Sequence, residues 1–176
     1  VEVAELLINH GADVNAEERW TGQSVLMWAA SRNHADMAEL LIASGADVSV
    51  RARSFDWERQ ITSEPRNQYR PAGGLTPLLY AARSGCLRCV QAIVEAGADV
   101  DMPTPEGVTP LIVAIDNFHF QTAHYLLDAD ANPHSFDWWG RTPLYTAIDV
   151  RTLESRGDRL DAQAQQAALE LARRLL

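Results

Sequence analysis

The chain has 176 residues, of which 47% are hydrophobic and 22% are charged, and its formal net charge at pH 7 is −9. An acidic surface repels phosphates, which argues against nucleic acid as a partner. All 15 basic residues are arginine, so chemistry that needs a lysine amine is excluded. No stretch approaches the roughly 20 consecutive apolar residues of a membrane helix, and the composition fits one elongated domain.

The first predicted element is a short helix over residues 1–9, which leads into a turn with the sequence G-A-D-V at Gly11. The same motif occurs again at Gly45 and Gly97, each time after a predicted helix that ends in paired aliphatic residues. A degenerate copy begins at Asp130. Aspartate in a turn commonly accepts hydrogen bonds from nearby backbone amides. We therefore expect this role for the turn aspartates Asp13, Asp47 and Asp99.

A second phrase, G-x-T-P-L, opens at Gly74, Gly107 and Gly140, with a constant spacing of 33 residues. A degenerate copy opens at Gly22, 52 residues before Gly74, so 19 residues are inserted between these two copies. A fixed period of this length is typical of an array of stacked supersecondary units. The period therefore predicts a repeat protein that carries an insertion.

The T-P-L phrase has the chemistry of a helix start. Thr76 is placed to accept a hydrogen bond from an orphan backbone N–H, and Pro77 follows at the first helical position, where its missing N–H costs nothing. Gly85 is placed to end the helix, because glycine tolerates positive φ. The pattern predicts helix pairs around residues 24–43, 76–96 and 109–129.

The two phrases in register resemble the ankyrin repeat, whose signature is T-P-L-x-x-A, a glycine turn, a second helix ending in L-L, and G-A-D-V-N. The resemblance covers about residues 1–150 and extends most closely to bacterial ankyrin-repeat proteins with similar hairpin insertions. It implies an all-α solenoid of stacked helix pairs joined by β-hairpin loops. We divide this single domain into a partial repeat (1–18), a repeat (19–49), an insertion within the inter-repeat hairpin (50–72), two repeats (73–103 and 104–136) and an irregular C-terminal repeat (137–176).

The insertion over residues 50–72 alternates apolar or aromatic residues with polar ones, which suits an extended strand. A turn at residues 65–67 would then let the chain return. One interpretation is a long β-hairpin finger that carries aromatic and arginine side chains to a partner. The other is that its aromatic residues fold back and cover the side of the domain. Both interpretations concern the same side chains, among them Phe55, Trp57, Arg59 and Tyr69.

The last repeat begins normally at Thr142, but its closing leucines come about 16 residues late, which places a second insertion over residues 151–166. A turn is expected at residues 156–158, followed by a final helix over residues 161–176 that is rich in alanine, glutamine and leucine. Both ends of the chain cut through repeats, and we expect it to be a fragment of a longer protein.

The resemblance implies a protein partner that is bound at the hairpin tips and at the inner surface of the first helices. Tryptophan and arginine dominate binding hot spots. Trp28 and Tyr80, by contrast, share a position that is buried in family members, so we expect both to pack in the core. The candidate partner-binding residues are Trp20, Gln23, Arg32, Phe55, Trp57, Arg59, Tyr69, Arg83, Asp116, Asn117, Trp138, Trp139 and Arg141.

Cys86 and Cys89 form the only C-x-x-C motif, at the start of a second helix. A structural pair of thiols and a disulfide formed in an oxidising compartment are the two leading interpretations. A catalytic redox site is disfavoured, because no β-α-β pattern surrounds the motif. Metal binding is also disfavoured, because the possible further ligands His34 and His119 lie in neighbouring repeats, and stacked helices are about 8–10 Å apart. A disulfide would fit the bacterial periplasm, towards which we lean over the cytoplasm.

No known catalytic or cofactor-binding motif is present, so no catalytic residue, cofactor or metal is predicted. The preferred function is a non-enzymatic protein–protein interaction module or scaffold, which uses hairpin tips, concave face and inserted finger. The alternatives are a regulatory or substrate-presenting segment of a larger enzyme and, third, a small-molecule receptor. Membrane insertion is not expected, and the sequence leaves the oligomeric state open.

Overall fold

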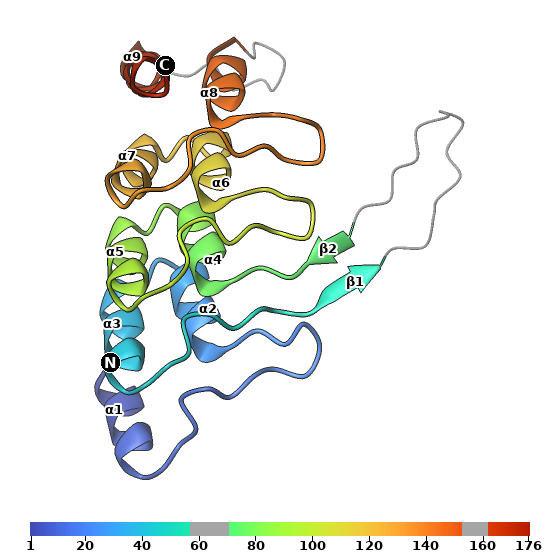
Figure 1. Cartoon of the computed structure of the whole chain (residues 1–176). Coiled ribbons are helices and arrows are strands. Elements are labelled where there is room, and N and C mark those ends of the chain that lie inside the picture. The colour runs from blue at the N-terminus through green and yellow to red at the C-terminus, as the bar shows by residue number, and fades with distance from the viewer. Residues whose placement is uncertain (57–70, 153–161) are drawn as a thin grey trace.

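The computed structural model describes residues 1–56, 71–152 and 162–176. Within these residues the helices stand in two parallel columns, which Figure 1 shows as an outer and an inner row. The all-α solenoid predicted from the repeats is confirmed. The outer column holds α1 (Glu2–Asn9), α3 (Ala35–Ala43), α5 (Leu87–Glu95), α7 (Phe120–Asp128) and α9 (Ala162–Arg174), and the inner column holds α2 (Val25–Ser31), α4 (Pro77–Ser84), α6 (Pro110–Asp116) and α8 (Pro143–Thr152).

The inner helices begin where the T-P-L phrase predicts. The hydroxyl of Ser24 accepts a hydrogen bond from Met27 N at 3.3 Å, and that of Thr76 accepts one from Leu79 N at the same distance. Thr109 caps α6 in the same way. A cap of this kind stabilises a helix by about 1 kcal/mol, and the proline at the first position sacrifices no hydrogen bond. Capping therefore sets the start of each repeat locally.

The inner helices end in a left-handed residue that turns the chain toward the outer column. Gly85 has φ 71° at the end of α4, as predicted, and Asn33 and Phe118 hold φ values of 59° and 62° at the corresponding places. Glycine is needed at residue 85 for a second reason, since a Cβ there would meet the imidazole ring of His119. Two separate constraints thus require glycine in the turn between α4 and α5.

The core lies between the columns and continues from one repeat to the next. Each inner helix packs on the next inner helix, and the outer helices α3, α5, α7 and α9 stack in the same order. Alanine at residues 30 and 82 lets the helices approach closely, and both side chains are fully buried. The leucine of the T-P-L phrase is at most 1% exposed in α2, α4 and α6, where it is Leu26, Leu78 and Leu111.

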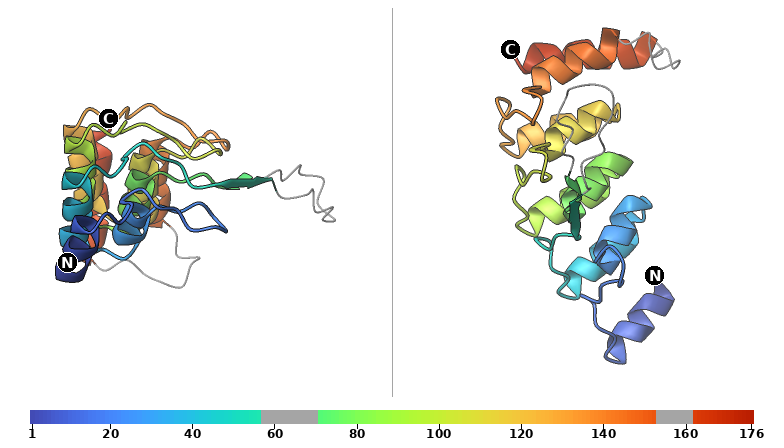
Figure 2. Two further views of the ribbon diagram at one scale, coloured as in Figure 1. Left: turned by 90° about the horizontal axis from the view of Figure 1, so that it is seen from below. Right: turned by 90° about the vertical axis from the view of Figure 1, so that its right-hand side faces the viewer.

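The connections from each outer helix to the next inner helix all project to the same side of the stack (Figures 1 and 2). Their turns are built as the sequence predicts, because Asp13, Asp47 and Asp99 each accept a hydrogen bond from the backbone amide two residues on, at 2.8 to 2.9 Å. Neighbouring turns are also tied together, since the Asn15 side chain accepts a hydrogen bond from Asp47 N at 2.8 Å. The loops therefore form a connected layer.

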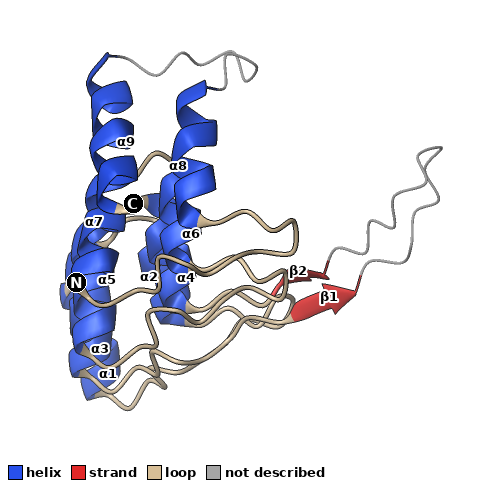
Figure 3. Ribbon diagram, turned by 45° about the horizontal axis from the view of Figure 1, so that its top comes forward, coloured by secondary structure: helices blue, strands red, loops and turns tan. Residues whose placement is uncertain are grey.

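The inserted connection begins and ends as a β-hairpin that extends past the other loops (Figure 3). Strand β1 (Ser54–Asp56) pairs antiparallel with β2 (Pro71–Gly73), with Phe55 opposite Ala72. Gly73 has φ 91°, and a Cβ there would collide with the carbonyl oxygen of Arg53. Only glycine allows the two backbones to approach this closely. Three of the predicted finger residues, Trp57, Arg59 and Tyr69, lie outside the described residues.

The C-terminal repeat ends in a helix, as predicted, and α9 packs against α7 and α8. The inner helix α8 continues to Thr152 and α9 already begins at Ala162, so the predicted insertion over residues 151–166 overlaps both helices. The alanine- and glutamine-rich sequence has enough helical propensity to extend α9 toward its N-terminus. The predicted turn at residues 156–158 lies outside the described residues.

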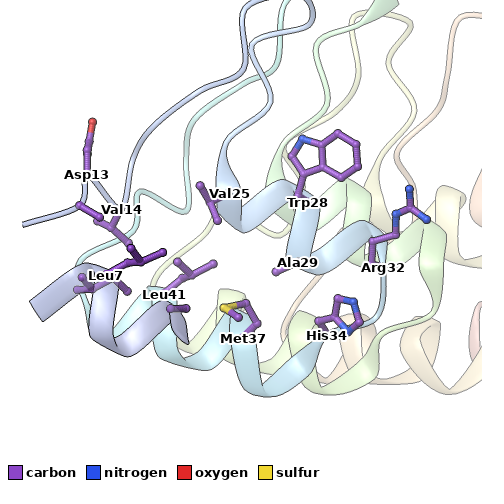
Figure 4. Close-up of a pocket in the computed structure, with 13 residues that line it drawn as sticks. Leu7, Asp13, Val14, Val25, Trp28, Ala29, Arg32, His34, Met37 and Leu41 are labelled. Carbon is purple, nitrogen blue, oxygen red and sulfur yellow. The ribbon is translucent and has the colours of Figure 1, made fainter. Parts of the chain in front are cut away.

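The N-terminal edge of the stack exposes side chains that are buried in later repeats. Leu7 on α1 is 56% exposed, although its counterparts Leu41, Ile93 and Leu126 are at most 3% exposed. Together with α2 and α3, this face of α1 forms an apolar groove of about 400 Å³ (Figure 4). In the described residues no inner helix packs over it.

The predicted burial of Trp28 is wrong, whereas that of Tyr80 is observed. Trp28 is 45% exposed and lines the N-terminal groove, while Tyr80, at the same position one repeat later, is 6% exposed. The difference arises because α2 covers the face of α4 that carries Tyr80, and no described helix covers the matching face of α2. Burial at this position is a property of the neighbouring repeat.

The register of the stack predicts unequal stability effects for matching leucines. Leu126→Ala should lower the free energy of unfolding by about 2–5 kcal/mol, because it leaves a cavity in the core. Leu7→Ala should cost only about 0.5 kcal/mol, because the side chain already contacts water. Urea denaturation followed by circular dichroism measures both, and equal losses would show that the α1 face is covered in solution.

Candidate partner-binding surface

Two sets of candidate residues face the same side of the molecule: those at the hairpin tips and those at the ends of the inner helices. Figure 2 shows the loops extending from the inner column, so the tips and this column bound one surface. We call it the inner surface. Its described candidates are Trp20, Gln23, Arg32, Phe55, Arg83, Asp116, Asn117, Trp138, Trp139 and Arg141.

The first hairpin tip is organised by one carboxylate. Glu18 accepts hydrogen bonds from the backbone N of Trp20 at 2.7 Å and of Gln23 at 3.3 Å, and also from the hydroxyl of Thr21. The Thr21 hydroxyl contributes most to lowering the pKa of Glu18 to about 2, and the backbone amides add to this effect against the opposing effect of burial. The turn is therefore held by an ionised side chain, and it presents Trp20, which is 84% exposed.

The side chain of Gln23 makes a contact within the molecule. Its side-chain amide donates a hydrogen bond to the Tyr80 hydroxyl at 2.6 Å, across 57 residues of sequence. Burial raises the pKa of Tyr80, so the phenol stays neutral. This contact attaches the first hairpin to the inner helix of the following repeat.

The fourth hairpin tip is organised by a buried carboxylate. The Asp137 side chain accepts hydrogen bonds from the backbone N of Trp139 and of Arg141, each at 2.9 Å, and from Arg141 Nε at 2.8 Å. The same guanidinium reaches Asp116 on α6 at 3.3 Å. Burial opposes the charge of Arg141, but these two carboxylates raise its pKa overall, so it stays protonated.

This network presents two tryptophans side by side in sequence. Trp138 is 71% exposed and Trp139 is 50% exposed. The Trp138 backbone N donates to the Glu106 carbonyl at 2.9 Å, which joins the third and fourth hairpins. The Arg141 guanidinium lies over the Trp139 ring, with its carbon 5.3 Å from the ring centroid. Both backbone positions are thus fixed while the indole rings remain accessible.

The ends of the inner helices carry different side chains in successive repeats. Arg32 lies over the Trp28 ring at 5.6 Å, and Arg83 over the Tyr80 ring at 5.0 Å, so both guanidiniums are exposed and stacked. On α6 the matching region holds Asp116, which pairs with Arg141, and Asn117, whose amide donates to the Val113 carbonyl at 2.8 Å. The inner surface therefore changes character between α4 and α6.

The carboxylates that organise the tips were not among the predicted site residues. A weak signal for them exists in the sequence, because Glu18 and Asp137 each precede the glycine of the hairpin by three or four residues. Thr104 has the same relation to Gly107 and accepts a hydrogen bond from Val108 N at 3.1 Å. An acceptor side chain shortly before the glycine thus marks a fixed tip. The Gln23–Tyr80 contact has no such local signal.

The C-x-x-C pair lies away from this surface. Cys86 and Cys89 are joined by a disulfide at the N-terminus of α5, and both residues are at most 1% exposed. The described ranges 1–56, 71–152 and 162–176 contain no group of three or more histidine, cysteine or acidic side chains that could hold a metal ion. In the same ranges, no helix is long and apolar enough to span a bilayer.

The lowered pKa of Glu18 predicts a pH-dependent contribution to stability. Because its pKa falls from 4.5 to about 2 in the folded state, the contribution is complete above pH 4.5 and is lost as the pH falls toward 2. Glu18→Gln should therefore lower the Tm most above about pH 5, and the difference from the unmodified chain should shrink toward pH 2. Calorimetry across this range tests it, and a difference independent of pH would contradict the assignment.

Comparison with known proteins agrees with this architecture. The family model for ankyrin repeats, in three copies, matches residues 1–52, 58–137 and 78–155. No curated protein matches the chain. Ankyrin repeats are generally protein–protein interaction modules and are typically non-enzymatic. The helix pairs, the capped T-P-L starts and the family match together show that this chain belongs to the ankyrin-repeat family.

Proposed function

We propose that the chain is a non-enzymatic scaffold that binds a partner protein through the inner surface, with the hairpin-tip tryptophans as anchors. The observation that carries this proposal is the exposure of Trp20, Trp138 and Trp139 on turns whose backbones are held by carboxylates. An exposed indole on a fixed backbone loses little conformational entropy on binding. Large aromatic side chains bury roughly 150–250 Å² each when they are covered.

The surroundings of the tryptophans support the same function. Phe55, 45% exposed at the base of the inserted hairpin, adds a further apolar side chain on the hairpin side. Soluble domains rarely expose large apolar side chains together on one face, and where they do, the face is commonly an interaction site. The polar network of Arg141 with Asp116 and Asp137 provides the kind of ordered polar neighbour that surrounds binding hot spots.

Alanine substitution of the anchors tests this function. The double variant Trp138→Ala/Trp139→Ala should lose capture of a partner from lysate of the source organism, with an affinity loss of about 30-fold or more, because a hot-spot residue contributes about 2 kcal/mol. The Tm should hardly change, since both indoles are exposed.

Gln121→Ala is the matched control, because Gln121 is exposed on the outer helix α7, on the other side of the stack. It should capture the same partner as the unmodified chain. Capture that survives the loss of both tryptophans would place binding elsewhere.

We also propose that the chain works in an oxidising compartment such as the bacterial periplasm. The disulfide between Cys86 and Cys89 supports this, because disulfides persist mainly outside reducing compartments. An alkylating agent is added first to intact cells and then again while the protein is denatured without reductant, and both cysteines should remain unmodified. After reduction, both cysteines should react. Mass spectrometry reads the result, and alkylation before reduction would contradict the proposed compartment.

A further inference from the structure

The described arginines fall into three groups according to what their guanidinium groups contact. Arg88, Arg141 and Arg174 form ion pairs with carboxylates. Arg51 and Arg53 donate to backbone carbonyls. In the described part of the chain, Arg19, Arg32, Arg83 and Arg173 show neither an ion pair nor a side-chain hydrogen bond. Among these four, Arg32 and Arg83 are the two whose guanidiniums lie over an aromatic ring. The chain has 24 acidic residues that could pair with arginine, so arginines without such a partner on the candidate surface point to a role in binding.

Arg32 and Arg83 belong to successive repeats. They sit at the ends of α2 and α4, which pack against each other. The hydroxyl of Ser84 donates to the Ala30 carbonyl at 2.7 Å, which connects the last turns of the two helices. Neighbouring helix axes are about 8–10 Å apart. The two arginines are thus carried by neighbouring inner helices.

Both guanidiniums make a contact within their own helix. Each stacks on an aromatic ring of its own helix, Trp28 for Arg32 and Tyr80 for Arg83. A guanidinium that lies over an aromatic ring still has N–H groups that can donate to a carboxylate. Figure 4 shows Trp28 and Arg32 side by side on α2. An ordered donor loses less entropy on binding than a mobile one.

Arginines whose guanidinium lies over an aromatic ring of their own helix occur in the repeats of α2 and α4. At the position of Arg83, the next repeats carry Asp116 on α6 and Asp149 on α8. A bound acidic segment would be attracted at α2 and α4, whereas Asp116 on α6 is already paired with Arg141. Nucleic acid does not fit, because its uniform negative charge would meet a chain of net charge −9.

We propose that Arg32 and Arg83 bind two carboxylates of an extended acidic segment in the partner protein. This rests on the proposed function and specifies the chemistry of the partner. In a polyproline II segment, residues three apart lie on the same face and about 9 Å apart, which matches the helix spacing. The recognised pattern is two acidic residues separated by two others.

Synthetic peptides test the proposal without knowledge of the partner. The probe is an acetylated and amidated Pro-Glu-Pro-Pro-Glu-Pro peptide, and its matched control has glutamine in place of both glutamates. NMR titration should show shifts at the Arg32 and Arg83 Nε–H signals with the glutamate peptide and not with the glutamine peptide. Binding should weaken as the salt concentration rises, because the charges are exposed.

The double variant Arg32→Gln/Arg83→Gln should bind the glutamate peptide about 10-fold more weakly, since each exposed charge pair contributes up to about 1 kcal/mol. Arg173→Gln is the control, because Arg173 is exposed on α9 and is removed from α2 and α4. It should bind like the unmodified chain. Equal binding by the double variant, or equal binding of the two peptides, would overturn the proposal.

The variant without Trp138 and Trp139 separates this inference from the proposed function. It should still bind the glutamate peptide, because these tryptophans lie on the fourth hairpin, removed from α2 and α4. Loss of lysate capture with retained peptide binding supports both proposals. Normal lysate capture by the double arginine variant would leave the scaffold function intact and would overturn the role of the arginine pair. Inorganic phosphate that binds as tightly as the peptide would also overturn it, by showing a simple anion site.

Discussion

Each helix pair of this protein depends on its neighbour to cover an apolar face that it cannot bury alone. The side chain of Leu41, Ile93 or Leu126 is almost completely buried, while Leu7 in the same register is more than half exposed. The amino acids are equivalent, so the difference lies in whether an inner helix packs over them. Stability in such a stack is a sum of repeat and interface contributions, and the whole arrangement depends on the interfaces.

The proposed binding surface follows from that stacking. Because every connection projects to the same side, the hairpin tips of successive repeats come together even though they are 33 residues or more apart in sequence. Contacts between repeats then fix them, such as the Gln23–Tyr80 hydrogen bond and the bond from Trp138 N to the Glu106 carbonyl. The surface is ordered before a partner arrives, which reduces the entropic cost of binding.

The tips are fixed by electrostatics of a local kind. The carboxylates of Glu18 and Asp137 each accept hydrogen bonds from several backbone N–H groups of their tip. The neighbouring tryptophans remain exposed. Further along the same surface, aromatic rings hold the guanidiniums of Arg32 and Arg83. The scaffold is common to its family, and we propose that these side chains carry the specificity of this chain.

The sequence alone determined what depends on short-range chemistry. The helix starts at Ser24, Thr76 and Thr109, the left-handed end at Gly85 and the turn aspartates all follow from residues within a few positions of each other. The period of the repeats then predicted the stack, because identical local units can cover one another only by packing in order. Only the tertiary structure decided the burial of Trp28 and Tyr80, which occupy one position in the repeat and differ because α2 covers one of them. It alone also brought Gln23 to Tyr80 and Arg141 to Asp116, since these contacts join separate repeats and have no counterpart in local sequence.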